Sequence, residues 1–329
     1  MSLSRRKTLA LAASALAAPA VLTRAATAAD GPARVRDAVA RFAALPVTAG
    51  CLVVADHPSA PWQAAHEAEK PLFVGSAVKT FMLAQYLRDV EEGRLTLQQL
   101  LTIDDGVRVL SSPVFLDLTG KTAGRNVLEA MIAHSDNTAT DVTLAAVGPD
   151  RVRALIAEVG LSQTRIPDST RRLFSYLAGA AEGEDLGWAG MQRIARGELA
   201  GPSRKPMNDT QSMIAPAEEM VRWYRAALRG AYFKKPETLV EFKRISAMAD
   251  SLPHVVPADT AAYGKGGSID WGGFHCFALP GQMVVNKVPV TFCFTITWDG
   301  PDDGVPKMFQ AYVETVGAVL REAAAAVGI

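Results

Sequence analysis

The chain has 329 residues, with 34 basic and 34 acidic side chains and a hydrophobic fraction of 49%. Such a length and composition suit one large globular domain, or two smaller ones, with a sizeable apolar core. Because the formal net charge is zero, no basic field indicates a nucleic-acid or membrane-surface partner, and we expect neither.

The N-terminal segment predicts an export signal. Ser4-Arg5-Arg6-Lys7 is a twin-arginine start, an Ala-rich apolar run follows over 8–22, and Ala26-Thr27-Ala28 offers a cleavage site. The apolar run is shorter than the about 20 residues that a membrane-spanning helix needs. We therefore interpret residues 1–29 as a cleaved signal and expect a periplasmic or extracellular protein without a membrane span. A membrane anchor and an unstructured tail are the alternatives.

The first third of the chain alternates between helical and strand-like patterns. Apolar residues at helical spacing predict a helix over 31–44, and a β-branched run predicts a strand over 48–56. A short apolar run over 71–74 then leads into a helical pattern over 77–92, which Gly93 ends. Residues 94–210 contain mostly helical patterns, of which the clearest are 126–133, 137–147 and 150–159.

The last third begins with a helical pattern over 216–229 and ends with one over 305–327. Three strand-like runs lie between them: 262–269, 272–279 and 290–298. Pro280-Gly281 is the expected turn between the second and the third run.

This order of elements predicts an α+β domain over residues 30–329. An antiparallel sheet, flanked by helices, would be built from both ends of the chain, and an all-helical subdomain would be inserted in the middle. Residues 30–75 and about 217–329 would form the α/β part, and about 76–216 the helical part.

Three cysteines follow the signal: Cys51, Cys276 and Cys293. An odd number leaves at least one free thiol in an exported chain. Cys276 and Cys293 fall in successive strand-like runs and could lie close together. We favour small, buried, apolar roles for all three.

The first chemical motif is Ser76-Ala77-Val78-Lys79, at the start of a predicted helix. Positions three apart share a helix face, so Lys79 would lie beside Ser76. Serine is a weak nucleophile without an adjacent base, and burial can lower the pKa of a lysine so that it serves as one. Alone, the motif fits better a serine helix cap followed by a surface lysine.

Two further motifs follow in the chain. Ser135-Asp136-Asn137 starts another predicted helix, and Lys265-Gly266-Gly267-Ser268 lies on a strand-like run. Separately they fit a helix cap and a glycine-weakened strand. Together with the first motif they supply a nucleophile–lysine pair, a hydroxyl–amide pair and a strand lysine. These are the parts that acyl transfer to an anionic substrate needs.

The three motifs resemble, in order and type, the S-x-x-K, S-D-N and K-T-G motifs of the class A β-lactamases and penicillin-binding serine hydrolases. Residues 73–97 and 134–139 also resemble the nucleophile helix and the second motif of that family. The resemblance covers roughly residues 31–329 and implies the β-lactamase/transpeptidase-like fold.

The resemblance also implies roles for individual residues. Ser76 would attack a β-lactam carbonyl, Lys79 would act in proton transfer, and Ser135 would relay a proton to the leaving nitrogen. The substrate-binding residues that it implies are Asn137, Lys265, Gly267 and Ser268. The backbone N–H groups of Ser76 and Ser268 would form the oxyanion hole.

Two departures from the family pattern stand out. Gly266 occupies the hydroxyl position of K-T-G, although Ser268 follows two residues later. The deacylation motif E-x-x-L-N is missing, because its glutamate and asparagine positions fall on Thr170 and Phe174. A rearranged loop could bring an acid to the site instead; the candidates are Glu182, Glu184 and Asp185.

We therefore expect a monomeric, exported serine hydrolase that acts on a β-lactam or peptide-like small molecule. The five histidines show no metal-ligand spacing, so we expect no metal ion and no cofactor. The alternatives are a D-alanyl-D-alanine peptidase, an esterase-like relative, and a penicillin-binding sensor without turnover.

Overall fold

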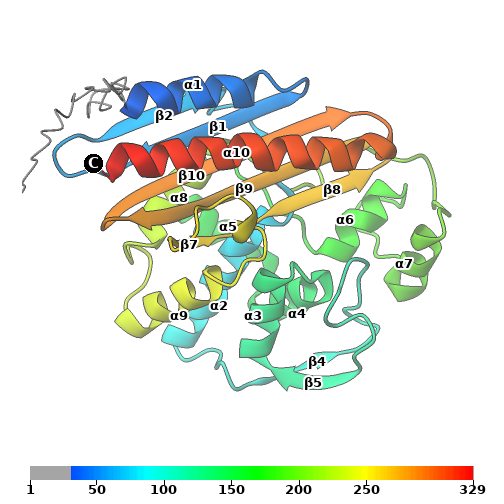
Figure 1. The fold of residues 1–329 in the computed structure, drawn as a ribbon. Coiled ribbons are helices and arrows are strands. Elements are labelled where there is room, and N and C mark those ends of the chain that lie inside the picture. The colour runs from blue at the N-terminus through cyan, green and yellow to red at the C-terminus, as the bar shows by residue number, and fades with distance from the viewer. Residues whose placement is uncertain (1–30, 329) are drawn as a thin grey trace, which may run out of the picture.

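The computed structural model describes residues 31–328 and shows an α+β fold (Figure 1). The predicted export signal, residues 1–29, lies outside the described residues. Six antiparallel strands form the main sheet in the order β2-β1-β10-β9-β7, and β8 also pairs with β9. The strands are β1 (Thr48–Ala55), β2 (Trp62–His66), β7 (Ala261–Gly264), β8 (Gly267–Trp271), β9 (Phe274–Val285) and β10 (Val288–Asp299). The sheet therefore combines strands from both ends of the chain, as predicted.

Helices cover both faces of the main sheet. The terminal helices α1 (Gly31–Ala43) and α10 (Val305–Val327) run side by side along one face (Figure 1). Phe42 of α1 packs edge-on against Phe294 of β10, with ring centroids 5.3 Å apart. On the other face, α8 (Ala217–Ala227) contacts β1, β9 and β10.

The inserted part is mostly helical, and the fold class is confirmed. Its helices are α2 (Lys79–Glu91), α3 (Gly124–Ala133), α4 (Asn137–Val147), α5 (Pro149–Glu158), α6 (Thr170–Leu177) and α7 (Gly187–Ala195). Helix α9 (Pro236–Ser246), which follows α8 in the chain, packs against α2 and α3 of this part. Two small sheets accompany them, one of β3 (Leu72–Phe73) with β6 (Ile214–Ala215), the other of β4 (Leu100–Ile103) with β5 (Gly120–Ala123). Helix α2 contacts α3, α4, α5 and α9, and the side chains from 79 to 87 are all buried. None of the helices in residues 31–328 is long and apolar enough to cross a bilayer.

The predicted turn at Pro280-Gly281 is wrong, because β9 runs through it without a break. Lys265 donates its backbone N–H to the Pro280 carbonyl (3.2 Å), so the ring nitrogen of Pro280 faces the same edge. This edge of β9 pairs first with β7 and then with β8, and Pro280 lies opposite the gap between them. Because no regular strand pairs with β9 at that point, the N–H that proline lacks would not have formed a ladder hydrogen bond. The turn lies instead at Asn286-Lys287, where both residues have a positive φ. The break between β7 and β8 also divides the predicted strand 262–269 into two strands.

All three cysteines are buried and unpaired. Cys276 lies opposite Thr297 and Cys293 opposite Pro280, so these two thiols are not cross-strand neighbours. Burial raises the pKa of the Cys51 and Cys293 thiols to about 12. The interpretation as small apolar core residues is confirmed.

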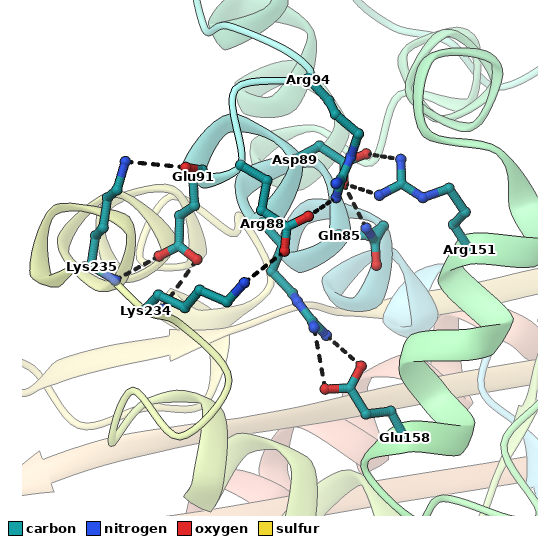
Figure 2. A network of polar contacts seen from close by, with 10 residues as sticks. Gln85, Arg88, Asp89, Glu91, Arg94, Arg151, Glu158, Lys234 and Lys235 are labelled. Carbon is teal, nitrogen blue, oxygen red and sulfur yellow. Dashed lines mark hydrogen bonds and ion pairs between the residues drawn. The ribbon is translucent and has the colours of Figure 1, made fainter.

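A network of polar contacts anchors the C-terminal end of α2 (Figure 2). The fully buried Asp89 carboxylate accepts hydrogen bonds from Gln85 (2.8 Å), Arg94 (2.7 Å) and Arg151 (2.6 Å). Other ion pairs of the network are Arg88 with Glu158 and Lys234 with Glu92. The helix that begins beside Ser76 is thus fixed to α5 and to the segment before α9 at its far end.

Replacing Asp89 with alanine should lower the free energy of unfolding by about 2–3 kcal/mol. The change removes a buried carboxylate and leaves the Arg151 guanidinium without its ion pair, whereas Arg94 keeps its ion pair with Glu92. Both arginines are more than 40% exposed and keep some hydration. Urea denaturation measures the effect. Glu158→Ala, which removes a largely exposed carboxylate from the same network, is the matched control and should change little. Equal effects of the two substitutions would contradict a special role for Asp89.

Candidate active site

The first motif lies on a 3₁₀ turn, η2 (Gly75–Val78), between β3 and α2. Gly75 adopts φ +52°, a left-handed conformation that favours glycine, and it turns the chain out of β3. Side chains three apart are eclipsed in a 3₁₀ turn, which places Lys79 beneath Ser76. Ser76 is partly exposed, whereas Lys79 is fully buried.

The Lys79 ammonium joins the first motif to the second. Nζ donates to the Ser135 carbonyl (2.6 Å), the Ser135 Oγ (3.3 Å) and the Asn137 Oδ1 (2.9 Å). Burial lowers the pKa of Lys79 well below its ordinary value, and the positive charge of Lys265 lowers it further. The structure thus holds an amine of lowered pKa within 3.3 Å of the Ser135 hydroxyl.

Asp136 holds the second motif in place. Its carboxylate caps α4 by accepting the N–H of Ala139 (2.7 Å), and it also accepts the N–H groups of Val114 and Phe115 (both 2.9 Å). Ser135, just before it, adopts φ +57°, which is uncommon for serine. The Asn137 amide donates to the Leu110 carbonyl (2.9 Å), which fixes its oxygen on Lys79.

The third motif lies where β7 gives way to β8. Lys265 is almost fully buried, its Nζ donates to the Gly266 carbonyl (2.7 Å), and burial lowers its pKa to about 8. Gly267 packs directly on the Ser76 turn: a Cβ there would lie 2.0 Å from the Val74 carbonyl oxygen and 2.9 Å from the Ser76 nitrogen. A Cβ on Gly75 would likewise lie 3.0 Å from the Ser268 nitrogen. The backbone nitrogens of Ser76 and Ser268 therefore lie in one small region.

The structure brings the predicted residues together around two adjoining hollows. Ser76, Ser135, Asn137 and Ser268 line an open cleft of about 430 Å³. Lys265, Gly267, Ser135 and Ser268 line a neighbouring cavity of about 230 Å³. Lys79 lies beneath the cleft, with its three acceptors around it. The cleft is also lined by Phe174, which stands at the asparagine position of the missing deacylation motif, and by five residues to which the sequence analysis gave no role: Ser111, Pro113, His134, Ile269 and Asp270.

One rim of the cleft is aromatic. Phe174 of α6 packs against Trp271 of β8, with ring centroids 5.9 Å apart, and so links the helical part to the sheet edge. The Trp271 indole N–H donates to Ser203 Oγ (3.1 Å). Phe174 stands at the asparagine position of the missing deacylation motif, whereas Trp271 belongs to no motif, so only the tertiary structure places Trp271 beside Phe174.

None of the three acids considered for deacylation lines the cleft. Asp185 forms an ion pair with Arg171, and Glu184 accepts the Ala181 N–H (2.9 Å). Thr170 is buried at the start of α6, where its N–H donates to Asp141 (2.6 Å). Asp270 is the one acid that lines the cleft, and its carboxylate pairs with the His275 Nδ1 (2.7 Å).

Within residues 31–328, no group of three or more His, Cys, Asp or Glu side chains is arranged to hold a metal ion. The arrangement instead offers a hydroxyl, a lysine of lowered pKa, two backbone N–H groups and a buried cation. Such a set can carry out acyl transfer.

The family model described as "Beta-lactamase enzyme family" matches residues 35–270. The chain belongs to the β-lactamase enzyme family. The match covers all three motifs, and it supports a serine β-lactamase-like hydrolase. No curated protein sequence matches the chain.

Solved structures of similar proteins show the same fold. A β-lactamase from Xanthomonas campestris is 17% identical with a TM-score of 0.68, and the match covers 91% of this chain and 99% of that one. A β-lactamase from Sphaerobacter thermophilus is 18% identical with a TM-score of 0.67, covering 90% and 97%. PBP-A is 16% identical with a TM-score of 0.66, covering 88% and 95%. At these identities the likeness concerns the fold alone.

Proposed function

We propose that the protein is an exported serine hydrolase that opens β-lactams through an acyl-enzyme on Ser76. The observation that carries this proposal is the buried amine of Lys79, one 3₁₀ turn from Ser76 and bonded to Ser135 and Asn137. A buried lysine of lowered pKa beside a serine is the activation that a hydroxyl nucleophile requires.

In this mechanism neutral Lys79 accepts the proton of Ser76 as its Oγ attacks the lactam carbonyl. The N–H groups of Ser76 and Ser268 stabilise the oxyanion, and losing one such donor typically costs about 10²–10³-fold in rate. Ser135, whose Oγ is 3.3 Å from Lys79 Nζ, passes a proton to the lactam nitrogen as the ring C–N bond breaks. Asn137 orients Lys79 and the substrate amide.

Lys265 supplies the charge that attracts a substrate carboxylate. Among the residues that line the cleft and the adjoining cavity, it is the only lysine or arginine. Gly267 lets β8 approach the nucleophile turn closely enough to bring the Ser268 N–H to the site.

Acylation should show a bell-shaped dependence of kcat/KM on pH. The rate rises as Lys79 loses its proton, and it falls as Lys265 loses its charge near pH 8, the pKa to which burial lowers it. Stopped-flow acylation by benzylpenicillin from pH 5 to 10 measures both limbs. Because the falling limb requires a substrate carboxylate, the neutral methyl ester of benzylpenicillin should lack it. A falling limb of the same size with the ester would contradict the role of Lys265.

Turnover of the acyl-enzyme distinguishes a β-lactamase from a penicillin-binding protein that is acylated without hydrolysis. Thr170 and Phe174 replace the residues that would activate the hydrolytic water, and this favours a long-lived acyl-enzyme and a penicillin-binding role as the second candidate. The test is to follow the hydrolysis of benzylpenicillin by the protein and by Ser76→Ala. Hydrolysis by the protein alone supports a β-lactamase, and acylation without hydrolysis supports the second candidate. If neither occurs, peptides ending in D-alanyl-D-alanine and simple esters are the next substrates to assay, and the β-lactam proposal is wrong.

A further inference from the structure

Ser251 occupies the space that a side chain on Gly266 would need. It lies between α9 and the 3₁₀ turn η3 (Leu252–His254). A Cβ placed on Gly266 would lie 2.6 Å from Ser251 Oγ and 2.7 Å from Ser251 Cβ. Gly266 itself has no left-handed φ, so its backbone would accept a larger residue. What excludes a side chain at 266 is therefore the serine, and not the conformation of the strand.

The hydroxyl of Ser251 is buried and has no hydrogen-bond partner among residues 31–328. Buried polar atoms in proteins almost always have a partner, and an exception calls for an explanation such as an absent ligand. Ser251 also lines the 230 Å³ cavity together with Lys265 and Gly266. That cavity shares Ser135 and Ser268 with the cleft of Ser76. An unused donor and the only lysine that lines this cavity are therefore in the same hollow.

The cavity suits one end of an anionic molecule. Lys265 Nζ uses one of its three protons on the Gly266 carbonyl, so it can still donate to an oxygen of a ligand. Asp250 lines the cavity as well, and its charge favours the protonated form of Lys265. Part of the lining is apolar, with Phe277 and Phe309 in contact at 5.3 Å between ring centroids.

We propose that Ser251 supplies, from a separate segment of the chain, the hydroxyl that the third motif lacks. Its Oγ–H donates to one oxygen of the substrate carboxylate, while the Lys265 ammonium binds the other. The inference rests on the proposed function in one respect, namely that the substrate is a carboxylate-bearing acyl compound. Ser268, which also lines the cavity, is the rival source of this hydroxyl.

The inference is tested by ligand binding to the Ser76→Ala protein, in which Ser76 cannot be acylated. Titration calorimetry compares benzylpenicillin with its neutral methyl ester. Adding Ser251→Ala should weaken the binding of benzylpenicillin by roughly 10- to 100-fold, the typical loss of a hydrogen bond to a charged group, and leave the ester unaffected. If Ser268→Ala removes the preference for the carboxylate and Ser251→Ala does not, the inference is wrong.

A compensating pair of substitutions guards against a general loss of structure. Gly266→Thr alone should lower the Tm, because its side chain meets Ser251. Ser251→Gly with Gly266→Thr relieves that contact and returns a hydroxyl, so it should restore the affinity that Ser251→Gly alone loses. A double variant no better than Ser251→Gly would overturn the inference.

The outcomes also distinguish this inference from the proposed function. If wild-type Ser76 is acylated but Ser251→Ala binds benzylpenicillin as tightly as its parent, only the inference fails. If binding depends on Ser251 but Ser76 is never acylated, only the proposed function fails. If the parent binds the ester as well as the acid, no carboxylate site exists and the inference is overturned.

Discussion

Replacing Lys79 with methionine should slow acylation of Ser76 by about 10²–10⁴-fold, the usual contribution of a positioned base. Methionine keeps an unbranched stem of similar length in the buried site but removes the amine that Ser135 and Asn137 hold. Ser76 then has no neighbouring group to take its proton. Stopped-flow measurement of acylation by benzylpenicillin at several pH values gives the rate.

Two observations make this result specific. Lys121→Met, at an exposed lysine of β5, is the matched control and should acylate at the wild-type rate. The residual acylation of Lys79→Met should also lose the rising limb of the pH profile, because the group that titrates there is gone. If Lys79→Met acylates within tenfold of wild type, Lys79 is not the base.

The substitution Gly267→Ala should have the second large effect. Its new Cβ would lie 2.0 Å from the Val74 carbonyl oxygen and 2.7 Å from the Ala77 nitrogen, which are backbone atoms of the nucleophile turn. Either β8 or the turn must move, and the Ser268 N–H then moves away from Ser76. Loss of that oxyanion contact predicts acylation slower by about 10²–10³-fold. Overpacking predicts a loss of about 1–3 kcal/mol in the free energy of unfolding.

Gly304→Ala is the matched control, because a Cβ there meets no atom within 4 Å and the φ of −76° suits alanine. This variant should keep both wild-type acylation and wild-type stability. Acylation rates and urea denaturation are measured on all three proteins. A Gly267→Ala protein that acylates at the wild-type rate would show that β8 does not set the geometry around Ser76.

The local parts of the site could be predicted from the sequence. Ser76 and Lys79 are three positions apart, and their relation depends only on a single helical turn. The order of elements also predicted a sheet from both chain ends, because strand-like runs at 48–56 and 290–298 bracket a helical middle. Both predictions rest on periodicity over short ranges, where sequence patterns are most informative.

Relations between distant segments were not predictable. Pro280 looks like a turn residue, but the break in the neighbouring strand removes the cost of placing it inside β9. The contact between Ser251 and Gly266 joins two segments whose approach depends on how η3 packs against β7. Likewise the contact between Phe174 and Trp271 joins α6 to β8, which are far apart in the sequence. No pattern in the sequence encodes these approaches.

Thr170, which stands at the glutamate position of the missing deacylation motif, lies next to a buried carboxylate in the structure. Asp141 of α4 accepts the N–H groups of Thr170 (2.6 Å) and Arg171 (3.0 Å), and so fixes the start of α6. Burial raises the pKa of Asp141 to about 6. A carboxylate is thus present next to this position, but it is used to hold the backbone. The Asp141 carboxylate therefore fixes the first turn of α6 and has two of its acceptor positions occupied by backbone N–H groups.

The central claim is that Ser76 becomes acylated, and intact-protein mass spectrometry followed by peptide mapping tests it most directly. The protein and Ser76→Ala are mixed with benzylpenicillin and sampled over time. We predict one penicilloyl group per wild-type chain, located on the peptide that contains Ser76, and no adduct on Ser76→Ala. An adduct that persists in Ser76→Ala, or no adduct on the wild type, would contradict the account.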